Sequence, residues 1–208
     1  DEAWNKTEAM MKVILDDLGL TYVEADDEAA FYGPKLDIQA KNVYGKEDTL
    51  ITIQIDFAAG ESFEMQYVDA DGTKQTPFVI HRSSIGCYER TLALLIEKYA
   101  GAFPLWMCPT QVKVLPITDR TLEYAEKVCE KLMLAGIRCE IDKRNEKIGY
   151  KIREAKLDKI PYVLVVGDKE MEEGTVNVNK RGVENKDTVK FESFLKKVVK
   201  ENAEKTIF

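Results

Sequence analysis

The sequence has little histidine and no paired cysteine motif. Among 208 residues it contains one histidine, His81, and four cysteines, none of which forms a C-x-x-C pair. Because zinc knuckles and dithiol redox sites are commonly built from such pairs, the pattern gives no support to either class of protein. Cys129 falls on the apolar face of a predicted helix and Cys139 inside a predicted strand, so both are most simply small buried groups. Free thiols of this kind are typical of a reducing cytoplasm.

Long apolar runs and secretory features are also missing. No stretch approaches the ~20 apolar residues that a membrane span needs. The start, DEAWNKTEAM, is charged and amphipathic, unlike a signal peptide. It also lacks an initiator methionine, which suggests a piece of a longer chain. We therefore expect a cytoplasmic protein without a membrane partner.

The charge is distributed unevenly along the chain. The net charge of −7 combines 9 Lys/Arg against 19 Asp/Glu in residues 1–109 with 21 against 18 in residues 110–208. Nucleic-acid binding depends on local potential and not on the sum for the whole chain. The second half is therefore the better candidate for RNA, although a neutral surface explains the modest excess equally well.

Two proline residues, Pro104 and Pro109, follow a predicted helix and mark the expected domain boundary, because proline cannot continue a helix. Before it, the pattern predicts strands at 36–43, 50–57, 63–68 and 78–80, with helices at 4–18 and 87–99. Asp71-Gly72 predicts a hairpin turn between the last two strands. Strands in series between helices indicate an antiparallel α+β unit.

After the boundary, strands and helices alternate. Strands are predicted at 111–117, 137–141, 162–166 and 175–179, the last at an edge of the sheet. Helices are predicted at residues 119–135, 147–157 and 191–201. This order predicts a three-layer α/β domain with helices on both faces of its sheet.

The most informative stretch runs from residue 140 to residue 170. A strand there leads into a charged turn, a basic helix and a second strand that ends at Gly167, which together predict a β-α-β unit with polar groups at the carboxyl ends of its strands. Residues 142–159 contain seven Lys/Arg and four Asp/Glu. This charge suits an anionic partner such as RNA. A merely solvated turn is the alternative, since charge runs are usually solvent faces.

Two segments of this stretch, RNEKIGYKIREA and VVGDKE, closely resemble the anticodon-binding domain of threonyl-tRNA synthetases. The resemblance implies that residues 110–208 are that domain and that Asn145, Glu170, Asn179 and Arg181 face anticodon bases. Amide, carboxylate and guanidinium groups can all read base edges. The family often has arginine where Asn179 stands, so Arg181 is expected to replace it or one base is read differently.

The first half resembles the same family in FYGPK (31–35), TIQIDF (52–57) and IHRSSIGCYER (80–90). The resemblance implies that residues 1–106 are the C-terminal part of a class II catalytic domain. It places Tyr32, Gln54 and Cys87 near threonine. Many members have serine in place of Cys87. Polar residues on one strand, such as those of TIQIDF, are also compatible with a plain solvent face.

The same resemblance assigns Lys35, Thr52 and Arg90 to ATP, and makes Arg90, Gln54 and Tyr32 the catalytic group. Arg90 lies in a segment similar to motif 3, where a planar guanidinium can follow the triphosphate and stack on adenine. An ion pair of Arg90 with a nearby glutamate is the alternative. Many members have glycine and glutamine where Ile51 and Thr49 stand, so this side of the ATP pocket is less well defined.

His81 matches a histidine that binds Zn²⁺ in the family, where the metal takes the amino and hydroxyl groups of threonine. Catalytic zinc needs three protein ligands and an open position. The other two family ligands, motifs 1 and 2 and the editing domain are all expected outside this chain. We therefore expect His81 alone to hold zinc weakly and the isolated chain to be inactive.

The resemblance implies ATP-dependent attachment of threonine to tRNA(Thr), with Mg²⁺ accompanying ATP and a homodimer in the full-length enzyme. DNA is not an expected partner. A stand-alone RNA-binding paralogue without catalysis is the main alternative, although the presence of Tyr32, Gln54, His81 and Arg90 together speaks against it. A non-RNA α/β ligand binder is a third hypothesis. It fits only the general topology, because the sequence has no glycine-rich phosphate loop.

Overall fold

The structure is a computed structural model that describes residues 2–207. It divides into two compact units, residues 1–94 and 95–208, so that helix α3 (Tyr88–Tyr99) runs through the division. The sequence placed the boundary later, between residues 106 and 110. Within the described residues, no helix combines the length and the apolar character that crossing a membrane requires.

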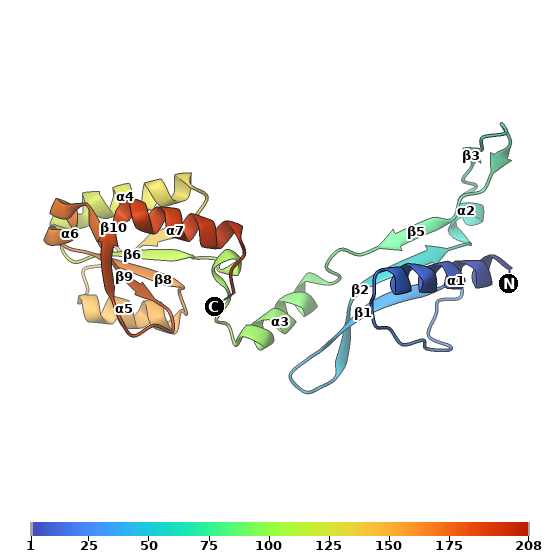
Figure 1. The fold of residues 1–208 in the computed structure, drawn as a ribbon, viewed down its shortest axis with the longest axis horizontal. Coiled ribbons are helices and arrows are strands. Elements are labelled where there is room, and N and C mark those ends of the chain that lie inside the picture. Colours follow the sequence, from blue (N-terminus) through green and yellow to red (C-terminus); the bar gives the residue numbers. More distant parts are fainter. Residues whose placement is uncertain (1, 208) are drawn as a thin grey trace. The chain divides into compact units, whose positions relative to one another are not determined.

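The first unit is built on a three-stranded antiparallel sheet with the order β1-β2-β5 (Figure 1). Its elements in chain order are α1 (Glu2–Asp17), β1 (Lys35–Lys41), β2 (Glu47–Asp56), α2 (Ala59–Ser62), β3 (Tyr67–Val68), β4 (Lys74–Gln75) and β5 (Val79–Arg82), followed by α3. The prediction of an antiparallel α+β unit is confirmed.

One predicted hairpin in this unit is confirmed at its turn, but its two strands differ from the prediction. The expected strand 63–68 is only the short β3, which pairs with β4 across the Asp71-Gly72 turn, while β5 pairs with β2 instead. The Asp56 carboxylate accepts the N–H groups of Ala58 and Ala59, which ends β2 and starts α2. Helix α2 thus lies between β2 and the segment in which the strand was expected.

The second unit contains a five-stranded mixed sheet with the order β10-β9-β8-β6-β7. Its elements are η1 (Leu105–Met107), β6 (Val112–Pro116), η2 (Asp119–Thr121), α4 (Leu122–Leu134), β7 (Cys139–Ile141), α5 (Ile148–Leu157), β8 (Tyr162–Val166), α6 (Asp168–Glu173), β9 (Thr175–Lys180), β10 (Asp187–Lys190) and α7 (Phe191–Ala203). Strands β7 and β8 both run parallel to β6, one on each side of it. The β-α-β unit is confirmed, with β6 lying between its two strands.

The predicted edge position of β9 is wrong, because β10 pairs along its outer side. Strand β10 has the sequence DTVK, and only Val189 of its four residues is even partly buried. A charged, exposed strand of this kind is typical of a sheet edge, where charge discourages pairing with other chains. It also carries little hydrophobic periodicity, so the pattern did not predict it.

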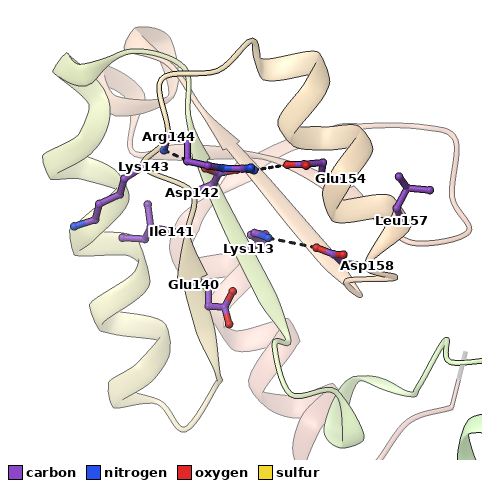
Figure 2. A pocket seen from close by; sticks show the side chains of 9 residues that line it. All are labelled: Lys113, Glu140, Ile141, Asp142, Lys143, Arg144, Glu154, Leu157 and Asp158. Atoms are coloured by element: carbon purple, nitrogen blue, oxygen red, sulfur yellow. Dashed lines mark hydrogen bonds and ion pairs between the residues drawn. The ribbon is translucent and has the colours of Figure 1, made fainter.

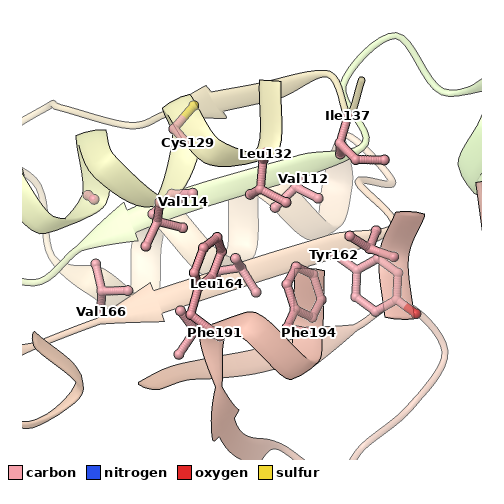
Figure 3. Close-up of a cluster of buried hydrophobic side chains, with 14 of the residues drawn as sticks. Val112, Val114, Cys129, Leu132, Ile137, Tyr162, Leu164, Val166, Phe191 and Phe194 are labelled. Carbon is pink, nitrogen blue, oxygen red and sulfur yellow. The ribbon is translucent and has the colours of Figure 1, made fainter. Parts of the chain in front are cut away.

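Helices cover both faces of the sheet, which confirms the three-layer prediction (Figure 1). On one face, Val112, Val114 and Leu164 pack with Leu132 of α4 and Phe194 of α7 (Figure 3). On the other face, Leu115, Val163 and Val165 pack with Ala155 of α5. Because β8 is buried on both sides, all five of its residues are buried. This core fixes the strand ends that carry the polar groups described below.

Candidate functional site

Polar side chains lie in rows across one face of the first unit's sheet. Lys35 of β1 is the partner of Gln54 of β2, which is in turn the partner of His81 of β5. The adjacent row pairs Asp37 with Thr52. Since alternate residues of a strand share a face, these five side chains lie on the same side of the sheet. The structure thus brings together residues that the sequence could only place in three separate motifs.

Tyr32 joins this face through the loop before β1. Its hydroxyl donates a hydrogen bond to Gln54 Oε1 at 3.1 Å, and its ring centroid lies 6.4 Å from that of His81. The loop is fixed to β2, because Phe57 N donates to Tyr32 O. Gly33 allows this contact, since a Cβ there would lie 1.7 Å from the Ile55 carbonyl oxygen. The Tyr32–Gln54 pair is therefore held by backbone geometry.

His81 is paired with the carboxylate of TIQIDF, a residue to which the resemblance assigned no role. Its Nε2 lies 2.9 Å from Oδ2 of Asp56, a residue that is only 8% exposed. The hydrogen bond to His81 lowers the pKa of Asp56, and the N–H groups of Ala59 and Ala58 lower it further. Metal-ligating histidines typically give their second ring nitrogen to a carboxylate in this manner.

The geometry thus fits a histidine that supplies one ligand to a metal. Within residues 2–207, no group of three or more His, Cys, Asp or Glu side chains is placed to hold a metal ion. The described residues therefore offer part of a ligand set at most.

Asp37 connects the two strand residues that the resemblance assigns to ATP. Its Oδ2 accepts a hydrogen bond from Lys35 Nζ, and its Oδ1 accepts one from Thr52 Oγ1, both at 2.6 Å. The sequence missed Asp37, although its spacing of two from Lys35 already placed both on one strand face. A carboxylate between a cation and a hydroxyl fixes the orientation of both groups.

The segment similar to motif 3 is held to the start of β2. Gly86 has a φ of +62°, and a Cβ there would lie 2.0 Å from the Leu50 carbonyl oxygen, so the position requires glycine. Arg90 is exposed and donates from Nη1 to the Thr49 carbonyl oxygen at 3.1 Å. Glu89 accepts a hydrogen bond from Cys87 Sγ at 3.0 Å, which lowers the pKa of Glu89.

In the second unit, an open polar cavity of about 750 Å³ lies beside β7 and α5. Figure 2 shows Arg144 between Asp142 and Glu154, and Lys113 beside Asp158. The Lys113 ammonium group lies 3.6 Å from the Asp158 carboxylate. Burial of Asp142 opposes its ionisation, yet hydrogen bonds from Arg144 are the larger effect and lower its pKa. The turn that follows β7 is therefore charged and tightly connected.

Two of the residues expected to face RNA lie at the carboxyl end of the parallel strands of the second sheet. Asn145 is exposed in the turn after β7, and Glu170 lies just after β8. Because β6, β7 and β8 are parallel, their carboxyl ends lie at the same end of the sheet, where α/β proteins usually bind ligands. Glu170 also has a structural contact, since its Oε2 accepts the Gly167 N–H at 2.9 Å.

The other two lie toward the opposite end of the sheet. Asn179 pairs with Val163 near the start of β8, is 8% exposed, and donates to Asn177 Oδ1 at 3.2 Å. The Arg181 guanidinium donates to carbonyl oxygens of Lys159, Ala102 and Phe103. The structure thus does not bring Asn179 and Arg181 to the end of the sheet that carries Asn145 and Glu170. The anticodon roles of Asn179 and Arg181 stay predictions.

Comparison with known proteins agrees with this two-part organisation. Residues 1–99 match the model of the tRNA synthetase class II core domain (G, H, P, S and T). Residues 111–201 match the model of the anticodon binding domain.

Individual relatives match across both parts. A threonine–tRNA ligase of Clostridium botulinum (strain Eklund 17B) is 59% identical over 98% of this chain, and threonine–tRNA ligase 1 of Bacillus subtilis is 51% identical over 97%. The chain spans 32% and 31% of the length of these two relatives, respectively.

A solved structure gives the same result. The crystal structure of the RNA binding domain of threonyl-tRNA synthetase from Cryptosporidium parvum superposes with a TM-score of 0.84 and 32% identity, covering 96% of this chain and 50% of that one. The fold, both domain matches and the identities agree, and this chain belongs to the threonyl-tRNA synthetase family of class II synthetases.

Proposed function

We propose that this protein takes part in the ATP-dependent attachment of threonine to tRNA(Thr). The observation that carries the proposal is the sheet face of the first unit, on which Tyr32, Gln54, Thr52, Lys35 and His81 lie together. An anticodon-binding domain in the same chain supports it. Catalysis by such a site rests on positioning and on charge stabilisation of the phosphates.

Threonine would lie against the Tyr32–Gln54 pair, whose hydroxyl and amide groups offer hydrogen bonds to its amino group. Cys87 would border the same site. Zinc, when bound, supplies a Lewis acid that takes the amino and hydroxyl groups of threonine, and His81 would be one of its ligands. Reading a hydroxyl in this way discriminates strongly, because a substrate without it leaves polar groups unpaired.

ATP would lie along Lys35, Thr52 and Arg90, with Mg²⁺ bound to its phosphates. Lys35 forms an ion pair with Asp37, so binding of a phosphate to Lys35 would replace one anionic partner by another. The exposed Arg90 can combine contact with phosphate and stacking on adenine. The homodimer expected of the full-length protein and its cytoplasmic location belong to the same proposal.

The anticodon of the tRNA would be read at the end of the second sheet that carries Asn145 and Glu170. Their amide and carboxylate groups can pair with the edges of unstacked bases, which is how proteins read single-stranded RNA loops. Asn179 and Arg181 belong to the proposal as well, since each could exchange its present partners for RNA.

Anticodon reading is tested by binding of the 208-residue chain to tRNA(Thr) and to the same tRNA with its second and third anticodon bases changed. Both titrations are made at one moderate salt concentration, because backbone contacts depend strongly on salt. We expect the altered tRNA to bind about tenfold more weakly or worse, which corresponds to about 1.4 kcal/mol. Equal affinity for the two would overturn anticodon reading and leave only a basic surface.

A further inference from the structure

The turn between β7 and α5 is anchored through both backbone groups of Asp142. Its N–H donates to the Val114 carbonyl oxygen at 3.0 Å, which continues the pairing of β7 with β6. Its carbonyl oxygen accepts a hydrogen bond from Lys151 Nζ at 2.9 Å. Lys151 is only 4% exposed, although lysine is rarely buried.

The side chain of Asp142 extends this anchor to the next residues. The residue is 5% exposed, and its carboxylate accepts three hydrogen bonds from Arg144: from the backbone N at 3.1 Å, from Nε at 2.9 Å and from Nη2 at 2.7 Å. Arg144 Nη2 also bonds to Glu154 of α5 (Figure 2). The turn is thus fixed from both sides, just before Asn145.

Burying charged groups is unfavourable, and a turn that only connects a strand to a helix does not require it. Removing an ammonium group and a carboxylate from water is unfavourable, and close pairing offsets this only when the geometry is good. A connecting turn of polar residues needs no buried charge. The network does, however, specify one orientation for the backbone that carries Asn145. Stabilisation of the domain alone is the competing explanation, so an experiment must separate the two.

We propose that Lys151 and Glu154 are positioning residues for the RNA-reading turn, acting through Asp142 and Arg144 to present Asn145. The inference rests on the proposed function and adds to it. Neither α5 residue needs to touch RNA in this arrangement. Each sets the orientation of the turn before RNA arrives, so that little ordering remains to oppose binding.

The test compares Lys151→Met and Glu154→Ala with Tyr162→Phe in the 208-residue chain. Lys151→Met removes the buried ammonium group but keeps much of its length. Glu154 has a side chain that is only partly buried, so its variant tests the network with little effect on folding. Tyr162→Phe is the control. It removes a partly buried hydrogen bond to Glu201 at the start of β8, away from the turn.

Three readouts are measured: the melting temperature, amide hydrogen exchange in residues 143–147, and the ratio of affinities for the two tRNAs of the preceding experiment. We expect both α5 variants to raise exchange in the turn and to lower the affinity ratio about tenfold, with binding of the altered tRNA unchanged. Tyr162→Phe should lower the melting temperature and leave the turn and the ratio as they are.

The outcomes separate this inference from the proposed function. A wild-type chain that does not distinguish the tRNAs overturns the proposed anticodon reading, and the positioning role with it. A wild-type chain that distinguishes them, together with α5 variants that distinguish them equally well, overturns the positioning role alone. A control that lowers the ratio as much as the α5 variants do would assign the effect to stability and also overturn the inference.

Discussion

Asp56 holds His81 with one carboxylate oxygen and the start of α2 with the other. Oδ2 lies 2.9 Å from His81 Nε2, whereas Oδ1 accepts the N–H groups of Ala58 and Ala59 at 2.8 and 2.9 Å. A carboxylate can only accept hydrogen bonds when ionised, so the imidazole donates from Nε2. In the neutral tautomer this leaves the lone pair on Nδ1, which is the atom free to bind a metal.

Asp56→Asn is expected to invert the tautomer of His81. The two backbone N–H groups still require an oxygen, so the amide should place its NH₂ group toward Nε2, which then accepts and leaves the proton on Nδ1. Because His81 is the only histidine, its ¹⁵N shifts report the tautomer without ambiguity. Asp37→Asn on the same sheet face is the control. Unchanged Nδ1 and Nε2 shifts in Asp56→Asn would show that Asp56 does not set the tautomer.

The sequence predicted best those elements whose signals are local. The strand at 162–166 is found at the predicted residues, because Pro161 and Gly167 bound an apolar run that is buried on both faces. The segment 63–68 misled for a different reason. Its pattern suits a strand, but only residues 67–68 form one, in a separate two-stranded sheet with β4. The exposed edge strand β10 has one apolar residue, Val189, and therefore little hydrophobic signal.

The same distinction applies to the candidate site. Motifs gave Tyr32, Gln54 and His81, but only the strand register brings them together. Asp37 was missed because its role depends on its pairing with Thr52 of another strand. Arg181 bonds to carbonyl oxygens almost 80 residues earlier in the chain. Contacts of that separation follow from packing, and no local pattern in a single sequence encodes them.

The exposed basic side of α5 should add salt-dependent affinity for tRNA. Arg153 and Lys156 are exposed on this helix, which follows the turn that carries Asn145. Replacing both with alanine should reduce the slope of log K against log salt by about 1.4, since each contact with a single strand contributes about 0.7. The anticodon preference should persist. Lys196→Ala with Lys197→Ala on α7 removes equal charge, and an equal change of slope there would refute a specific contact.

Arg181 should contribute to stability through its three carbonyl partners. Its guanidinium connects the segment before η1 to the turn after α5, and hydrogen bonds from charged donors are worth about 1.5–3 kcal/mol. We expect Arg181→Ala to lower the free energy of unfolding by about 2 kcal/mol in urea denaturation, and Arg181→Lys not to restore it, because one ammonium cannot span these sites. Arg120→Ala breaks an exposed ion pair with Asp168 and should cost less than about 1 kcal/mol. Equal losses in the two alanine variants would contradict the role given to Arg181.

Asp142 should make the second unit sensitive to acid. Hydrogen bonds from Arg144 hold the pKa of Asp142 below its ordinary value of 3.8. A carboxyl group with a lowered pKa in the folded state stabilises the fold above its unfolded pKa, and that contribution is lost as the pH falls through the folded value. As the pH is lowered below about 4, the free energy of unfolding measured by urea denaturation should therefore decrease in the wild type. It should decrease less steeply in Asp142→Asn. Asp187→Asn, on the exposed strand β10, removes the same charge away from this network and should retain the wild-type slope. Parallel curves for the wild type and Asp142→Asn would mean that the ionised carboxylate contributes nothing, and that Arg144 is held by Glu154 alone.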